Sequence, residues 1–204
     1  MSKNVTHVMA QGLARKINRY ARKDDLGLKK MAYSLEIIFL TVSKLVVIYL
    51  LAAIFGVVVQ TMIIHFAFGL LKHFSFGLHA RKSTVCTLVS CVMLVLVPWG
   101  LSGVGLGNDI VAVIFFAVIF VLYMYAPADT ESRPLIGRNY RKKLKIKAVC
   151  AGAVLMLIAL FVPNESAKLL LTLGAVFQGV CVLPITYKIL RRSERNYEPY
   201  ELYS

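Results

Sequence analysis

The stretch SLEIIFLTVSKLVVIYLLAAIFGVVVQTMIIHFAFGLL, residues 34–71, decides the fold. It is an apolar block with few polar interruptions, and it follows a charged segment. As one unbroken helix it would be ~57 Å long at ~1.5 Å per residue, nearly twice the ~30 Å hydrocarbon core of a bilayer. We therefore expect the block to fold back on itself as two membrane spans, with Gly56 as the hinge.

The rest of the chain has the same apolar character. Of its 204 residues, 58% are hydrophobic and only 17% are charged, which is more apolar side chain than a soluble domain of this length can bury. The sequence therefore predicts an all-α integral membrane protein with about six transmembrane helices. The expected spans are residues 34–55, 57–71, 85–101, 110–126, 146–162 and 167–190, the last kinked at Pro184.

Three regions follow from this pattern: a cytoplasmic or interfacial segment (1–33), a six-span domain (34–190) and a cytoplasmic tail (191–204). No N-terminal signal peptide is expected, because the first apolar run begins only after the charged segment. Within residues 5–20, helical spacing aligns four large side chains, namely Met9, Leu13, Ile17 and Tyr20. This predicts an amphipathic helix that contacts lipid in the inner headgroup layer or, alternatively, a cytoplasmic helix packed on the bundle.

The positive charges set the predicted topology. Of the 24 Lys and Arg residues, 22 lie in residues 1–33, 72–82, 133–147 and 188–195, all of which fall on one side of a six-span chain. The positive-inside rule makes that side cytoplasmic and places both termini there. The net charge of +14 is thereby explained without a nucleic-acid partner.

The segment FGLHARKSTVC, residues 76–86, carries the candidate chemistry. Ser83 or Thr84 is a natural helix N-cap, which would place Cys86 in the first turn. The positive end of a helix, together with nearby Arg81 and Lys82, favours a thiolate, and His79 could act as its general base.

The spacing of the two residues imposes a condition on this hypothesis. On one unbroken helix, His79 and Cys86 would stand ~10.5 Å apart along the axis, whereas proton transfer needs roughly 3 Å. A Cys–His dyad therefore requires a break in the backbone between them. The alternative is that Cys86 is a small packing residue and that His79 is a solvated loop residue.

Two carboxylates are candidates for a third, orienting residue. Glu36 lies near the cytoplasmic end of the first span, and Asp129 follows the fourth span. A structural hydrogen-bonding role for Glu36 is the alternative. The four cysteines show no CxxC spacing, so we expect neither a metal site nor a disulfide framework, and no cofactor is implied.

The motifs resemble those of a known family. GLHARKSTVC resembles the G-x-H-A segment, with a Cys seven residues after the His, of the accessory gene regulator B (AgrB) family. YAPADTESRPL, residues 125–135, is similar to that family's YAPA segment, and SKLVVIY and LPI are also similar to family members. The resemblance extends over essentially the whole chain.

The resemblance implies a membrane cysteine endopeptidase of Gram-positive quorum sensing, working at the cytoplasmic face of the cell membrane as a homodimer. Its implied substrate is an AgrD-type precursor peptide, with Cys86 as the nucleophile and His79 as the general base. Cleavage would release the C-terminal fragment, and the acyl group on Cys86 would then pass to a substrate thiol or hydroxyl, closing a thiolactone or lactone ring. An exporter subunit for the signal peptide, or an inert membrane scaffold, are the competing interpretations.

The cytoplasmic cations are the candidate contacts for an acidic part of that substrate, the alternative being that they only enforce topology. These candidates are Arg81, Lys82, Arg133, Arg138, Arg141, Lys142 and Lys143. The chain departs from the family pattern here, since Glu131, Ser132 and Arg133 stand where some members carry a lysine run.

Overall fold

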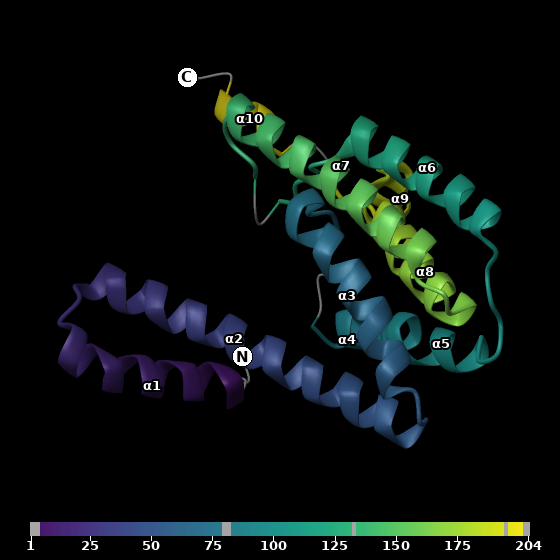
Figure 1. Ribbon diagram of the computed structural model, residues 1–204. Coiled ribbons are helices and arrows are strands. Elements are labelled where there is room, and N and C mark those ends of the chain that lie inside the picture. The colour runs from purple at the N-terminus through teal and green to yellow at the C-terminus, as the bar shows by residue number, and fades with distance from the viewer. Residues whose placement is uncertain (1–4, 79–82, 132–133, 194–195, 202–204) are drawn as a thin grey trace. The chain divides into compact units, whose positions relative to one another are not determined.

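The computed structural model describes residues 5–78, 83–131, 134–193 and 196–201, and every regular element within them is helical. This confirms the all-α prediction. The helices are α1 (Val5–Ala21), α2 (Asp25–Ile54), α3 (Val58–Ser75), α4 (Ser83–Cys91), α5 (Val97–Gly100), α6 (Asn108–Tyr125), α7 (Arg138–Phe161), α8 (Glu165–Val182), α9 (Pro184–Ile189) and α10 (Glu198–Glu201), with a π-helical segment, η1 (Val92–Leu96), joining α4 to α5 (Figure 1).

Within the described residues, four helices are long and apolar enough to cross a membrane: α2, α6, α7 and α8. They coincide with four of the six predicted spans. The other two predicted spans coincide with α3 and with the shorter apolar helix Thr84–Gly100. The chain is thus built as a membrane protein, while the count of six spans and the cytoplasmic placement of the termini stay predictions.

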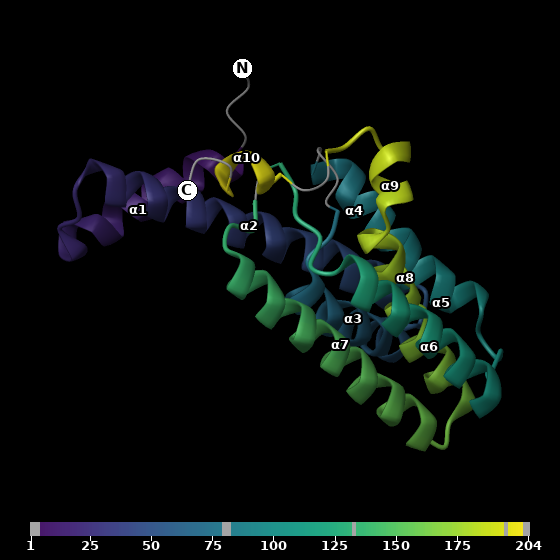
Figure 2. The same cartoon turned by 90° about the horizontal axis from the view of Figure 1, so that it is seen from above.

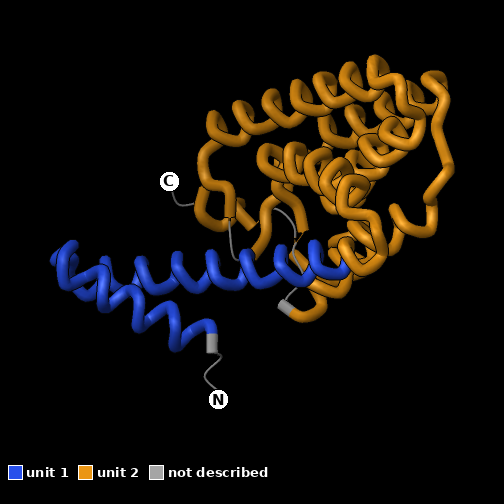
Figure 3. Tube along the Cα trace, turned by 60° about the horizontal axis from the view of Figure 1, so that its bottom comes forward, with its two compact units in different colours: residues 1–51 blue, residues 52–204 orange. Residues whose placement is uncertain are grey.

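The chain divides into two compact units, residues 1–51 and 52–204 (Figure 3). In the first unit, α2 begins after Asp24, whose side-chain oxygen accepts a hydrogen bond from the Gly27 amide at 3.0 Å. On α1, Ala10 and Ala14 are buried, whereas the stripe of Met9, Leu13, Ile17 and Tyr20 is exposed. The predicted lipid-contacting face is therefore uncovered within its own unit.

The second unit is a bundle of α3, α6, α7 and α8 (Figures 1 and 2). Helix α8 packs on α3 and α6, and α7 packs on α6 and α3. Its core consists of fully buried apolar side chains contributed by all four helices, among them Leu71, Phe115, Leu122, Leu155 and Ala175. Helices α3 and α8 approach closely at Gly174, where a Cβ atom would lie 2.7 Å from the Ala67 Cβ and the Ile64 carbonyl oxygen.

The two predicted breaks are confirmed. Gly56 has a positive φ of 70° and lies in the turn between α2 and α3, a conformation that glycine adopts without steric cost. Leu183 is extended, α8 ends at Val182, and α9 begins at Pro184. Proline fits the first turn of a helix because no amide donor is needed there.

The π-helical segment has a local cause. In a regular α-helix the Leu94 carbonyl would accept from the amide of residue 98, which is proline and has no N–H. The buried Thr61 hydroxyl on α3 donates to that carbonyl instead, at 2.8 Å. This bond replaces the missing donor and ties the α4–η1–α5 helix to α3.

Candidate active site

Cys86 lies in the first turn of α4, as predicted, three residues after the helix begins at Ser83. Thr84, one of the two predicted N-cap residues, is therefore inside the helix. The Cys86 side chain is partly exposed, so a reacting group can reach the thiol.

The described backbone leaves the helical conformation just before His79: α3 ends at Ser75 and α4 begins at Ser83. The break that a dyad requires between His79 and Cys86 stays a prediction. The turn that follows α3 contains two consecutive residues with positive φ, Phe76 at 56° and Gly77 at 99°. His79, Arg81 and Lys82 lie outside the described residues.

The turn after α3 pairs with the segment that follows α6. The Gly77 amide donates to the Ala128 carbonyl at 2.8 Å, and the Ala128 amide donates to the Ser75 carbonyl at 3.0 Å. Together they form a parallel β-bridge between Phe76 and Ala128. Phe76, at the start of the histidine–cysteine segment, and Ala128, at the end of YAPA, are thus adjacent in space although they lie 52 positions apart in the sequence.

Helix α8 also forms hydrogen bonds with the turn that follows α3. Gln178 is fully buried, and its Nε2 donates to the Phe76 carbonyl at 2.6 Å and to the Ser75 hydroxyl at 2.7 Å. Near the end of the same helix, the Cys181 carbonyl accepts from the Leu78 amide at 3.0 Å. Helix α3, the segment that follows α6 and helix α8 therefore hold the backbone immediately before His79 in place.

Lys72, near the end of α3, contacts the turn that follows this helix. Its Nζ donates to the Leu78 carbonyl at 3.4 Å and lies 5.0 Å from the centre of the Phe68 ring. Burial lowers the pKa of Lys72, and its electrostatic interactions with Cys181 and Cys86 oppose this shift. The sequence analysis did not single out this residue.

The two candidate orienting carboxylates have different surroundings. Asp129 is 5% exposed, and its Oδ2 accepts no hydrogen bond within the described part of the chain, while its backbone carbonyl accepts from the Tyr187 hydroxyl at 2.9 Å. Glu36 belongs to the first unit, where its Oε2 lies 2.9 Å from the Nδ1 of His7. Its predicted role toward His79 remains a prediction.

The predicted substrate-binding cations are partly gathered at one place. Arg138, Arg141 and Lys142 line a cavity of about 400 Å³ at the start of α7, together with Lys145, Asp129 and Tyr197. Lys143 is exposed and is not part of this lining, and Arg133 lies outside the described residues. Lys145 belongs to the 133–147 loop whose seven cations were candidates as a group. Sequence reasoning missed Lys72 and Gln178; a glutamine in an apolar span was a usable signal for the second.

Metal chemistry finds no support in the described residues, which contain no group of three His, Cys, Asp or Glu side chains able to hold an ion.

Comparison with known proteins gives a consistent result. The sequence model of the family described as "Accessory gene regulator B" matches residues 8–182. A "Putative AgrB-like protein" of Listeria innocua is 42% identical over 180 residues, 88% of each chain. One of Clostridium acetobutylicum is 38% identical over 97% of this chain and 95% of its own. The "Accessory gene regulator protein B" of Staphylococcus carnosus is 32% identical over 88% of this chain and 96% of its own. No solved structure matches significantly.

Proposed function

The chain belongs to the accessory gene regulator B family, and on that premise we propose that it is a membrane cysteine endopeptidase acting on an AgrD-type precursor peptide. Membership connects the chain to quorum-sensing signal processing. The observation that carries the finer proposal is the place of Cys86. It is a partly exposed thiol in the first turn of α4, and the turn before that helix is hydrogen-bonded to the segment that resembles the family's second motif.

The proposed reaction begins with proton transfer from the Cys86 thiol to His79. The thiolate attacks the scissile carbonyl carbon, the C–N bond breaks, and the leaving nitrogen takes the proton from His79. The products of this step are a thioester on Cys86 and a free C-terminal fragment.

The second step conserves the activation of the acyl group. A thiol or hydroxyl of the substrate attacks the thioester carbon, the bond to the Cys86 sulfur breaks, and the proton from the attacking group restores the Cys86 thiol. Exchange between two thioesters changes the free energy little, whereas hydrolysis is downhill and would waste the intermediate. A site at the membrane boundary limits the access of water.

The backbone around the site supports precise placement of the reacting groups. Residues 76–78, immediately before His79, are held by hydrogen bonds: Gln178 of α8 donates to Phe76, and the amides of Gly77 and Leu78 donate to the carbonyls of Ala128 and Cys181. Fixing a base and a nucleophile in reacting geometry accounts for a large part of many enzymatic rate enhancements. The segment that precedes the proposed base is therefore positioned by the bundle.

Co-expression with the precursor tests the proposal. Cys86→Ala and His79→Ala should each abolish release of the C-terminal fragment, followed by mass spectrometry. Cys181→Ala and the exposed-site control Cys150→Ala should retain it. Cleavage that persists in Cys86→Ala would refute the peptidase assignment, and intact cleavage with failed secretion would favour the exporter alternative.

The proposed setting is the Gram-positive cell membrane, with Cys86 at the cytoplasmic face and a homodimer as the active unit. Labelling intact cells with membrane-permeant and impermeant maleimides tests the face, because only the permeant reagent should modify Cys86. Co-purification of two differently tagged copies tests the dimer.

A further inference from the structure

The cavity of about 400 Å³ at the start of α7 lies at the end of two candidate membrane spans. It is lined by the last residues of α6, by residues 126–129 and by basic side chains of α7. Both α6 and α7 are long and apolar enough to cross a membrane, and they pack on each other. A helix that crosses a bilayer reaches the headgroup layer at its end, so the cavity is at the level of phospholipid headgroups.

Three of the basic side chains form one stripe of α7. Arg138, Lys142 and Lys145 follow one another at intervals of four and three residues, which places them on the same face of the helix. In the part of the chain that the structure describes, none of them has a carboxylate within ion-pair distance. Like charges at this spacing repel one another, so an anion bound among them would stabilise the helix.

The fourth cation of the lining, Arg141, is already paired. Its guanidinium donates two hydrogen bonds to the Glu201 carboxylate, at 2.6 Å and 2.9 Å, and the Gly137 amide donates a third at 2.8 Å. The planar fork of arginine matches a carboxylate in this two-point geometry. The guanidinium carbon also lies 3.7 Å from the centre of the ring of Tyr197, which lines the cavity, whereas Glu201 does not.

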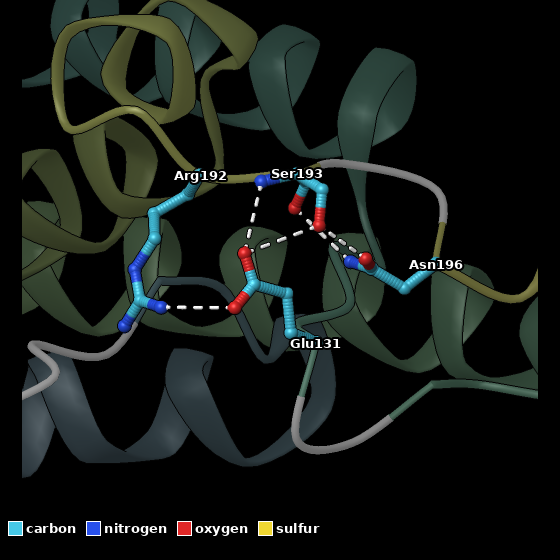
Figure 4. A network of polar contacts seen from close by, with 4 residues as sticks. All are labelled: Glu131, Arg192, Ser193 and Asn196. Atoms are coloured by element: carbon cyan, nitrogen blue, oxygen red, sulfur yellow. Dashed lines mark hydrogen bonds and ion pairs between the residues drawn. The ribbon is translucent and has the colours of Figure 1, made fainter.

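A second set of contacts holds the C-terminal segment beside the residues that follow α6 (Figure 4). The Glu131 carboxylate accepts from Arg192 at 3.2 Å and from the Ser193 hydroxyl at 3.3 Å, and Ser193 is hydrogen-bonded to the Asn196 side chain. Glu131 is one of the residues that stand where some family members carry lysines. These contacts fix the segment that carries Tyr197, so the cavity wall formed by this residue is part of the folded chain.

Asp129 is the acidic residue of the cavity lining. Its side chain is buried, and its Oδ2 accepts no hydrogen bond within the described residues. Buried polar atoms are rarely left without a partner. The four cations still exceed Asp129 and Glu201 by two charges. A ligand that suits this cavity therefore combines a negative charge for the cations with a hydrogen-bond donor for Asp129.

The surface of α6 next to the cavity is apolar and aromatic. Tyr123 adjoins the lining, because the Nζ of Lys145 lies 5.2 Å from the centre of its ring. Phe116 and Phe120 precede Tyr123 at helical spacing on the same face, and all three side chains are more than half exposed within their unit. Such a surface suits acyl chains, and a tyrosine near the end of a span is typical of the membrane interface.

We propose that this cavity binds the headgroup of an anionic phospholipid that carries a hydroxyl group, as phosphatidylglycerol does. The phosphate lies among Arg138, Lys142 and Lys145, the headgroup hydroxyl donates to Asp129, and the acyl chains lie along the exposed face of α6. Basic pockets between membrane spans are typical binding sites of anionic headgroups. The inference concerns lipid binding alone and does not depend on the proposed cleavage.

Substitutions in the stripe should weaken lipid binding by a measurable factor. One cation near an anionic headgroup changes the affinity by roughly fivefold. Lys145→Gln should therefore bind phosphatidylglycerol roughly fivefold more weakly than the parent chain, whereas Lys145→Arg, which keeps the charge, should retain the affinity. Lys143→Gln is the matched control, because Lys143 is exposed on the same helix but outside the lining, and it should leave the affinity unchanged.

Native mass spectrometry of the full chain in a non-ionic detergent measures the affinity for the first bound lipid. The probes are short-chain phosphatidylglycerol, phosphatidylmethanol, which has the same charge but no headgroup hydroxyl, and zwitterionic phosphatidylcholine. The parent should prefer phosphatidylglycerol to both, and Asp129→Ala should bind phosphatidylglycerol and phosphatidylmethanol equally. Inorganic phosphate at the same concentration should not displace the lipid, because it has no acyl chains.

Four results would overturn the proposal. The first is an affinity for phosphatidylglycerol in Lys145→Gln equal to that in Lys143→Gln, with thermal melts showing both variants folded. The second is equal affinity of the parent for phosphatidylglycerol and phosphatidylmethanol. The third is displacement of the lipid by inorganic phosphate, which would indicate a site for free phosphate. The fourth is no preference over phosphatidylcholine, and binding of a Glu-rich peptide in that case would assign the cations to the substrate.

Discussion

Gln178, fully buried on α8, donates a hydrogen bond at 2.6 Å to the carbonyl of Phe76, the first residue after α3. It donates a second bond to Ser75 at 2.7 Å. This single side chain joins the last part of the bundle to the turn that leads to His79. Its role is to position the backbone rather than to touch the substrate.

Replacing Gln178 with Leu should therefore impair cleavage and stability together. The Phe76 carbonyl and the Ser75 hydroxyl would lose a buried partner, at a cost of roughly 1–3 kcal/mol each when the group stays unsatisfied. Steady-state assays should show a fall in kcat, with a smaller change in KM. Gln60→Leu, near the other end of α3, is the control and should leave kcat unaltered; an unchanged kcat in Gln178→Leu would remove the positioning role.

Gly77→Ala should be severely damaging. Gly77 has a φ of 99°, and a Cβ atom there would lie 2.9 Å from the Cys181 carbonyl oxygen and 3.3 Å from Gln178 Nε2. Both the backbone conformation and the close contact disfavour any side chain. Fragment release per folded molecule is the measurement.

The matched control for that substitution is Gly69→Ala on α3, the helix that precedes the turn. Gly69 is helical, and a Cβ atom there meets nothing within 4 Å. Alanine should be neutral or stabilising by roughly 0.5–1 kcal/mol. Equal activity of the two variants would show that the turn at Gly77 is unimportant.

Gly174→Ala should separate α3 from α8. The new methyl group would lie 2.7 Å from the Ala67 Cβ and from the Ile64 carbonyl, and overpacking of this kind costs roughly 1–3 kcal/mol. Small residues allow this close approach of helices in membranes. Thermal unfolding in detergent should show a lower midpoint than for Gly179→Ala, where the nearest atom would lie at an ordinary 3.8 Å.

The contact between Glu201 and Arg141 should be lost only in strong acid. The hydrogen bonds from Arg141 and from the Gly137 amide lower the pKa of Glu201 from its ordinary 4.5 to about 2. At a pH above its ordinary pKa, a carboxyl group whose pKa is lowered by a contact stabilises that contact. This stabilisation is lost as the pH falls from about 4.5 through about 2. Distances between spin labels on the tail and on α7 should therefore be constant from pH 7 to pH 5.

The same measurement on Arg141→Gln provides the comparison. Without the guanidinium, the labelled tail should already be displaced at pH 7. A tail that stays in place in Arg141→Gln would mean that Glu201 does not hold it.

Local sequence signals predicted the helices and their breaks. Gly56 and Pro184 predicted the two interruptions because their backbone preferences act within a few residues. Helix ends were less well predicted: α2 begins at Asp25 rather than near residue 34, and α7 begins at Arg138 rather than near residue 146. Hydropathy locates the apolar part of a helix, but a helix also continues through polar residues where caps and good helix formers allow it.

The candidate site was predictable only in part. The place of Cys86 in a first helical turn follows from nearby residues. The bridge from Phe76 to Ala128, the Gln178 contacts and the Glu201–Arg141 pair join positions far apart in the sequence, and no periodicity or spacing specifies such partners. Their formation depends on how the helices pack.

The central claim is that the Cys86 sulfur carries the substrate's acyl group. Purified protein, quenched in acid shortly after mixing with an intact precursor, should yield a peptide of this chain with the N-terminal part of the precursor attached at Cys86. Hydroxylamine should release the adduct, and Cys86→Ser should abolish the thioester. An active wild-type enzyme that never shows a covalent adduct at Cys86, or shows one at Cys181 instead, would contradict the mechanism.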